Sequence, residues 1–148
     1  MFKRLLVSLC IIFVPLAGNP HQRETLYINQ DTPIQPYEKL WLAISKVESG
    51  GDPFAIGDKH LKNKSYGIVQ IRQTRLDDYE RETGIYYTIY DMFDPSRAKS
   101  VFLHYATKED YRNIEKISRC WNGGKTGMRK QSTKKYYQKV LKAYLELE

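Results

Sequence analysis

Cysteine is scarce in this chain of 148 residues, which contains only Cys10 and Cys120. Cys10 lies in an apolar N-terminal run, so the rest of the chain holds a single cysteine and cannot form an internal disulfide. We therefore expect an exported product to be stabilised by its hydrophobic core. A nucleophilic role for Cys120 is open, but it lacks a convincing partner base, and we interpret it as a small buried hydrophobe.

Metal-binding clusters and nucleic-acid motifs are also missing. The three histidines, His21, His60 and His104, are scattered along the chain, and only one cysteine remains to accompany them. This pattern does not match the ligand spacing of a metal site. We expect no metal, no other cofactor and no nucleic-acid partner, because no recognisable nucleic-acid-binding motif is present.

Long hydrophobic runs are limited to the N-terminus. Lys3 and Arg4 precede a mostly apolar run at 5–17, and the small residue Gly18 follows it. This order is typical of a secretory signal peptide, here 1–18, and the run is shorter than the roughly 20 residues that span a bilayer. We expect an exported protein, periplasmic or extracellular after signal-peptide removal. An uncleaved N-terminal anchor is the alternative.

Acidic residues are absent from 117–145, a stretch that contains eight basic residues, and the whole chain has a formal net charge of +7. A surface of this kind attracts polyanions. The export signal favours the anionic bacterial envelope over nucleic acid as the partner. A solvated basic face without a specific partner is the other interpretation.

The pattern of apolar residues predicts a mainly α, single globular domain over 36–148, preceded by a linker or N-terminal arm at 19–35. The segment 65–71, Ser-Tyr-Gly-Ile-Val-Gln-Ile, fits either a strand or the start of a helix, so the fold is α+β at most, with a minor strand element. The segment 124–132 is predicted to be a loop. Helices are predicted over 37–49, 74–83, a segment that starts at Asp94-Pro95, 111–121 and 133–147.

Glu48 occupies an unusual position, in the last turn of the first predicted helix and directly before Ser49 and two glycines. The helix macrodipole is negative at that end, and neighbours such as Trp41 and Val47 would remove solvent from the carboxyl group. Both effects raise the pKa of a carboxylic acid. An acid that stays protonated near neutral pH is suited to general acid catalysis. A solvated glutamate at a frayed helix end is the alternative.

Four short segments support the catalytic interpretation by their order. They are Glu48-Ser49, Gly-Ile-Val-Gln-Ile at 67–71, Cys-Trp-Asn-Gly-Gly at 120–124, and Tyr136 with Val140 four residues later. Together they resemble the catalytic domain of SLT-type lytic transglycosylases in the lysozyme-like superfamily. The resemblance covers about 36–145 and implies a lysozyme-like fold. Each motif alone is weak, whereas four in this order are fairly specific.

The resemblance implies a role for each matching residue. Glu48 would protonate the glycosidic oxygen between N-acetylmuramic acid and N-acetylglucosamine and then act as the base on the muramyl 6-hydroxyl, which gives a 1,6-anhydro end. The hydroxyl of Tyr136 would lie close to Glu48, with Tyr137 as the competing candidate. The substrate-binding residues would be Ser65, Gln70, Asn122 and Tyr136.

Three positions depart from the family pattern. Gly57 stands where many members carry a substrate-binding serine, Val69 replaces a methionine, and Cys120 replaces a small residue before the aromatic. These departures concern the contacts with individual sugar units.

Two alternatives to a lytic transglycosylase, which is a lyase, are open. A hydrolytic muramidase usually needs a second carboxylate, and Asp58, ten residues after Glu48, is the candidate. A non-catalytic cell-wall-binding protein that kept the fold is the alternative from another class. A site with one carboxylate favours transfer to a sugar hydroxyl, so we expect a lyase. We expect it to act on peptidoglycan glycan strands and to be a monomer. Association with envelope-spanning secretion or conjugation machinery, wall turnover and phage entry all remain compatible contexts, as do endo- and exo-cleavage.

Overall fold

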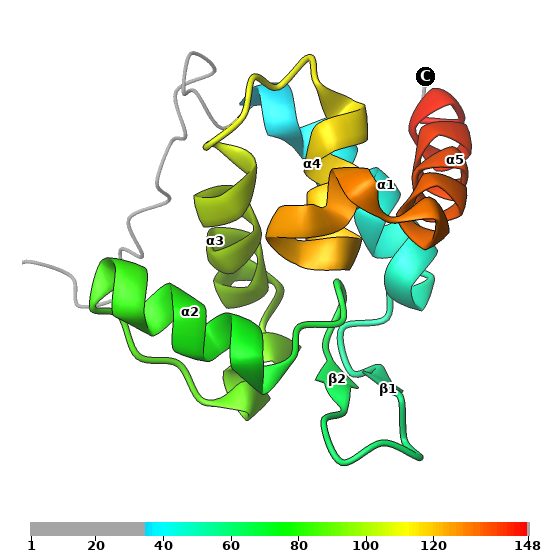
Figure 1. Cartoon of the computed structure of the whole chain (residues 1–148). Coiled ribbons are helices and arrows are strands. Elements are labelled where there is room, and N and C mark those ends of the chain that lie inside the picture. The colour runs from blue at the N-terminus through cyan, green and yellow to red at the C-terminus, as the bar shows by residue number, and fades with distance from the viewer. Residues whose placement is uncertain (1–34, 148) are drawn as a thin grey trace, which may run out of the picture.

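The computed structural model describes residues 35–147 (Figure 1). The predicted signal peptide and all but the last residue of the predicted arm lie outside these residues. No helix in the described part is long and apolar enough to cross a membrane. The elements are η1 (Gln35–Tyr37), α1 (Glu38–Ser49), β1 (Ile56–Gly57), β2 (Ser65–Tyr66), α2 (Gln73–Thr83), η2 (Ile89–Phe93), α3 (Pro95–Ala106), α4 (Ile114–Gly123), η3 (Gly124–Arg129) and α5 (Gln131–Leu145), where η marks a 3-10 helix.

The predicted fold class is confirmed, because helices dominate residues 35–147 and the strand element described there is a hairpin of two strands with two residues each. The helix α1 buries one face, which carries the apolar residues Leu40, Trp41 and Ile44. The ring of Phe102, on α3, lies between Trp41 and Trp121, with ring centroids 5.5 and 5.4 Å apart. This aromatic chain joins α1, α3 and α4 into one core, since buried aromatic pairs add packing energy beyond their area.

Two glycines end α1 as the sequence predicts. Gly50 has φ of 70° and Gly51 has φ of 87°, both in the left-handed region. Their N–H groups donate to the carbonyls of Lys46 and Ser45, at 3.0 and 3.2 Å. This cap satisfies the last carbonyls of the helix and turns the chain sharply. It leaves Glu48 in the final turn of α1.

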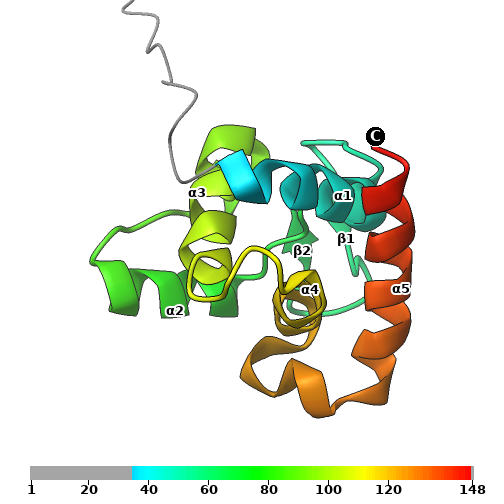
Figure 2. The same cartoon turned by 90° about the horizontal axis from the view of Figure 1, so that it is seen from above.

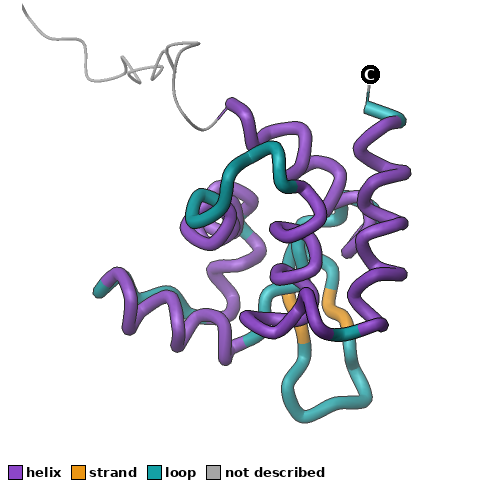
Figure 3. Tube along the Cα trace, turned by 45° about the horizontal axis from the view of Figure 1, so that its top comes forward, coloured by secondary structure: helices purple, strands orange, loops and turns teal. Residues whose placement is uncertain are grey.

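The ambiguous segment 65–71 forms a strand followed by a tight turn. Ile56 pairs with Tyr66 and Gly57 with Ser65 in an antiparallel register, and the loop between these strands projects from the helical body (Figure 3). Gly67 then has φ of 75°, and a Cβ there would lie 1.9 Å from the backbone oxygen of Met92. The turn therefore packs directly on η2.

The predicted boundaries of α4 and the following loop are wrong. The helix starts at Ile114, because the Asn113 side chain caps it by accepting from Lys116 N at 3.2 Å. It continues through Asn122 to Gly123, where a Cβ would lie 2.6 Å from the Thr133 methyl group, so the absence of a side chain lets this turn pack against α5. Residues 124–129 form η3 instead of a loop, and α5 begins at Gln131.

The helix α5 packs along α1, on the side of the molecule opposite α2 (Figures 1 and 2). Val140 and Ala143 on α5 are buried in the common core. Lys46 on α1 and Glu146 after α5 form an ion pair at 2.8 Å. This packing brings residues near the end of the described chain next to the end of α1.

Candidate active site

A groove with a volume of about 1010 Å³ runs between the hairpin, the start of α2, the end of α3 and the face of α4. Ligand sites in proteins usually have volumes of about 300 to 1,000 Å³. The groove is therefore large enough to bind a ligand. The lining side chains used below are Glu48, Asp58, Gln70, Arg75, Trp121 and Asn122.

Glu48 is half-buried in the wall of this groove, at the end of α1. The hydroxyl of Tyr136, on α5, donates a hydrogen bond of 2.8 Å to Glu48 Oε1. Tyr136 and Val140 share one face of α5, and the burial of Val140 turns Tyr136 toward α1. Tyr136 is thus the tyrosine that reaches Glu48, and the competing Tyr137 makes no hydrogen bond with Glu48.

Burial raises the pKa of the Glu48 carboxyl above its ordinary value, and the negative charge of Asp58 adds to this rise. The hydrogen bond from Tyr136 and the positive charges of Arg75 and Arg72 act in the opposite direction without cancelling the effect of burial. Burial also raises the pKa of Tyr136 far above its usual range, so its hydroxyl remains a donor. The pair is a protonatable acid held by a neutral phenol.

Gln70 and Ser65 close the hairpin turn beside Glu48. Gln70 has a positive φ of 54°, and its amide nitrogen donates to the carbonyls of Ala55 and Gly67, at 3.2 and 2.9 Å. Its Oε1 accepts from the buried hydroxyl of Ser65 at 2.8 Å. The amide hydrogens of Gln70 are thus engaged within the protein, so Gln70 shapes the groove more than it offers donors to a ligand.

Gly57, the position at which the family pattern has a serine, lies against this pair. A Cβ at Gly57 would be 2.1 Å from Gln70 Oε1 and 2.7 Å from Ser65 Oγ. The contact between Gln70 and Ser65 therefore depends on the absence of a side chain at Gly57. A serine at 57 would require Gln70 to leave its position.

Asp58 lies in the groove but is held by other side chains. Its Oδ2 accepts from Arg72 at 2.5 Å, and its backbone has φ of 51°. The same oxygen lies 3.1 Å from the Ser65 hydroxyl, whose single proton has Gln70 Oε1 as its nearer acceptor. Arg72 also donates to the carbonyl of Asn63 at 3.0 Å, which anchors the hairpin loop. The ion pair with Arg72 offsets much of the negative charge that Asp58 brings to the groove.

The third motif lines the groove from α4 through Cys120, Trp121 and Asn122. Asn122 is exposed, and its amide forms no hydrogen bond with any residue in 35–147. Cys120 lines the groove and is only half-buried, so our expectation of a buried cysteine is wrong. Cys120 lies on the side of α4 that borders the groove and is not among the buried residues of this helix.

Arg75, Tyr105 and Trp121 form a part of the groove that sequence reasoning missed. The guanidinium of Arg75 lies over the rings of Trp121 and Tyr105, 4.2 and 4.8 Å from their centroids. It also donates to the Trp121 carbonyl at 2.7 Å. Arg75 follows Gln70 by five residues, and no sequence periodicity connects it with residues of α3 and α4.

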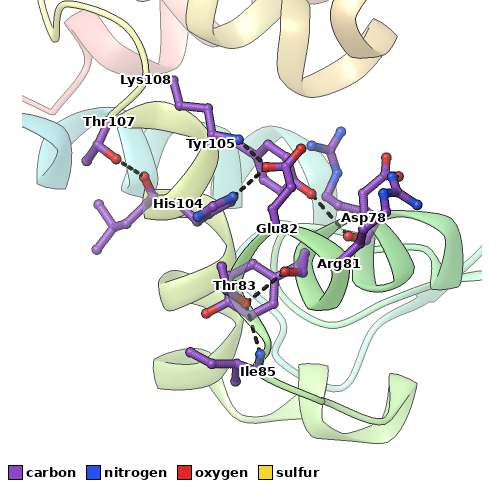
Figure 4. A network of polar contacts seen from close by, with 12 residues as sticks. Asp78, Arg81, Glu82, Thr83, Ile85, His104, Tyr105, Thr107 and Lys108 are labelled. Atoms are coloured by element: carbon purple, nitrogen blue, oxygen red, sulfur yellow. Dashed lines mark hydrogen bonds and ion pairs between the residues drawn. The ribbon is translucent and has the colours of Figure 1, made fainter.

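A polar network holds α2 against α3 at the outer wall of the groove (Figure 4). Glu82 on α2 pairs with Lys108 and with His104, the latter at 2.8 Å. The hydrogen bond from Lys108, followed by that from His104, lowers the pKa of Glu82 to about 2. Among residues 35–147, no three His, Cys, Asp or Glu side chains gather as a metal site would require.

Comparisons with known proteins identify the family and the fold. The family model described as the Transglycosylase SLT domain matches residues 31–143. The chain is similar to the crystal structure of a lysozyme from Tapes japonica, with 26% sequence identity, a TM-score of 0.54, and coverage of 70% of this chain and 86% of that chain. A search of curated proteins gives no match. Because the family model spans most of the chain, and a lysozyme-like fold surrounds the acid, this protein belongs to the SLT transglycosylase domain family.

Proposed function

We propose that this protein is a lytic transglycosylase that cleaves the β-1,4 bond between N-acetylmuramic acid and N-acetylglucosamine in peptidoglycan. Its family is one of peptidoglycan-cleaving enzymes. The observation that carries the proposal is the hydrogen-bonded pair of Glu48 and Tyr136 in the wall of a ligand-sized groove. The raised pKa of Glu48 supports its use as a proton donor near neutral pH.

In the first step Glu48 donates its proton to the glycosidic oxygen. The bond between that oxygen and the muramyl C1 breaks, the oxygen keeps the electron pair, and N-acetylglucosamine leaves with a free hydroxyl. The muramyl C1 becomes cationic, as in other glycosidic cleavages. Tyr136 stabilises the new Glu48 carboxylate, because a hydrogen bond to a charged acceptor is stronger than one to a neutral acceptor.

In the second step the muramyl 6-hydroxyl attacks C1. The Glu48 carboxylate takes the hydroxyl proton while the new bond between O6 and C1 forms, which gives the 1,6-anhydro end. Glu48 returns to its protonated state and no water is consumed. One carboxyl group therefore acts as the acid in the first step and as the base in the second. A site with a single free carboxyl group can carry out both steps.

The state of Asp58 favours this route over hydrolysis. A hydrolase uses its second carboxylate to stabilise the cation or to position water, and the ion pair with Arg72 occupies Asp58 Oδ2. Hydrolysis is the second candidate function. It is favoured by the presence of Asp58 in the same groove, where its charge acts on Glu48.

Mass spectrometry of products from purified peptidoglycan tests the proposal. The parent protein should release muropeptides that are lighter by one water than hydrolytic products. Glu48→Gln should release none, and the control Glu80→Gln should match the parent, because Glu80 is exposed and lies outside the groove. Reducing ends from the parent would establish the hydrolase instead. Equal cleavage by Glu48→Gln would remove Glu48 from the mechanism and favour a different role for the fold.

The proposal includes export, because peptidoglycan lies outside the cytoplasmic membrane. The signal-peptide pattern at 1–18 supports it. Fractionation of cells that express the full chain should place a shortened protein outside the cytoplasm. A variant without residues 1–18 is the control and should stay in the cytoplasm, whereas retention of the full-length parent in the membrane fraction would indicate an uncleaved anchor.

A further inference from the structure

Arg75 is held in a fixed position by contacts from two other helices. Its guanidinium lies over the rings of Trp121 and Tyr105 and donates to the Trp121 carbonyl at 2.7 Å. The Tyr105 hydroxyl in turn donates to the Arg75 backbone carbonyl at 3.2 Å. Stacking and hydrogen bonding together fix both the plane and the position of the charge.

The guanidinium of Arg75 has more hydrogen-bond donors than these contacts use. An arginine side chain carries five N–H donors. One hydrogen bond, to Trp121, is formed within residues 35–147. Arg75 lines the groove, and no carboxylate of the described part forms an ion pair with it. Its remaining donors and its charge therefore act within the groove.

The charged and titratable groups that act on Glu48 come from three sides of the groove. Tyr136 contacts it from α5, Asp58 acts from the hairpin loop, and Arg72 and Arg75 act from the start of α2. Asp58 and Arg72 are paired with each other at 2.5 Å, so their charges largely offset one another. Arg75 forms no ion pair among the described residues, and its charge acts on Glu48 and Tyr136. The carboxylate of Asp78, also on α2 and in the groove lining, acts on Arg75.

We propose that Arg75 is a positioning residue for catalysis, which holds a fixed positive charge beside the Glu48–Tyr136 pair and stabilises the Glu48 carboxylate formed when the proton leaves. This inference rests on the proposed function, because it assumes that Glu48 is the acid. Burial favours the protonated form of Glu48 before the reaction, and the charge of Arg75 favours the carboxylate that forms during it. The two opposing effects let one carboxyl group act as acid and then as base.

A titration of Glu48 by carbon-13 NMR tests this inference without requiring activity. The side-chain carboxyl signal of Glu48 is assigned by its loss in Glu48→Gln. In Arg75→Gln, which keeps an amide donor for the Trp121 carbonyl but has no charge, the midpoint should move to higher pH. In Arg75→Lys, which restores the charge, the midpoint should return toward that of the parent. Arg75→Met is the second neutral variant, in case Arg75→Gln does not fold.

The matched control is Arg112→Met, which removes one positive charge from an exposed residue that pairs with Asp110 outside the groove lining. Its Glu48 midpoint should equal that of the parent. A folded neutral Arg75 variant with an unchanged midpoint would overturn the inference. Thermal unfolding curves identify the folded variants, and a purely structural role of Arg75 would lower stability without moving the midpoint.

The rate of peptidoglycan cleavage gives an independent measurement. The neutral variants should lose about tenfold in kcat/KM, the factor that corresponds to about 1.4 kcal/mol. The alkaline limb of their pH profile should move to higher pH. A parent protein that does not cleave peptidoglycan would refute the proposed function, while the NMR titration would still decide whether Arg75 acts on Glu48.

Discussion

The hydroxyl of Tyr136 donates a hydrogen bond of 2.8 Å to Glu48 Oε1, although 88 positions separate the two residues. Glu48 ends α1 and Tyr136 lies on α5, and the packing of these two helices sets the distance between acid and phenol. The bond satisfies one carboxyl oxygen and leaves the other oxygen for a ligand. We therefore expect changes at either residue to alter the pKa of Glu48 and the rate of the proposed reaction.

Removal of the Tyr136 hydroxyl should lower catalysis far more than stability. Tyr136→Phe removes a hydrogen bond to a group that becomes charged, which is worth about 1.5–3 kcal/mol, so kcat/KM should fall roughly 10- to 100-fold. The pKa of Glu48 should rise further, because this hydrogen bond lowers it. Peptidoglycan cleavage as a function of pH measures both effects. Tyr137→Phe is the control, and an equal loss there would show that the Glu48 contact is not the cause.

Glu48→Gln should make the protein more stable at neutral pH. The folded state holds Glu48 at a raised pKa, so between the unfolded and folded pKa values the folded state binds more protons than the unfolded state. The free energy of unfolding of the parent therefore falls as pH rises through that window. Gln carries no such penalty and keeps an oxygen for Tyr136.

Thermal unfolding over a pH series checks this expectation. The Tm of Glu48→Gln should exceed that of the parent at pH 7, and the two should converge below about pH 4, where the carboxyl is protonated in both states. Glu80→Gln is the control. A Tm difference that is the same at every pH would show that the ionisation of Glu48 is not responsible.

Gly67 should tolerate a side chain far less well than Gly84. Both residues have positive φ, 75° and 74°, but a Cβ at Gly67 would lie 1.9 Å from the Met92 carbonyl, whereas nothing lies within 4 Å at Gly84. Gly84→Ala should cost about 1–2 kcal/mol from the backbone alone. Gly67→Ala should cost about 1–3 kcal/mol more from the clash. Urea unfolding measures the difference, and equal losses would contradict the close approach of the turn to η2.

The Glu82 network should contribute stability that depends on both salt and pH (Figure 4). Lys108 and His104 lower the pKa of Glu82 from 4.5 to about 2, so its contribution is present above pH 4.5 and is lost as pH falls toward 2. Because Glu82 is exposed and solvent screens it, Glu82→Gln should cost no more than about 1 kcal/mol at pH 7.

Urea unfolding at low and high salt tests the network. The loss in Glu82→Gln should shrink in 1 M salt, where the Debye length is about 3 Å. Glu80→Gln, on the same helix, should show little loss under either condition. A loss that salt does not change would point to packing instead of charge.

Glu48 could be singled out from the sequence because a carboxylate in the last turn of an apolar helix, followed by Ser49 and two glycines, is visible within ten residues of chain. Its position alone also fits a solvated glutamate, and the order of the four motifs favoured the catalytic interpretation. The helix α1 and its left-handed cap follow from the same short segment. Tyr136 could not be chosen from a local signal, because only the spacing of the family motif distinguished it from Tyr137. The burial of Val140 gives the physical reason for that choice.

Arg75 and the end of α4 could not be predicted in this way. The position of Arg75 depends on Trp121 and Tyr105, which come from different helices. The sequence predicts a helix that ends at residue 121, but Gly123 is still helical and its missing side chain allows close packing against Thr133 on α5, which is a tertiary contact. Local propensity contains no information about either neighbour.

The hydrogen bond between Glu48 and Tyr136 also sets an order of events during synthesis. Ribosomes produce the acid early and the phenol late, since α1 is the first α-helix described and α5 is the last. A nascent chain, or one cut before residue 131, contains Glu48 without its hydroxyl partner. The complete pair therefore forms only after the polypeptide has been made through α5.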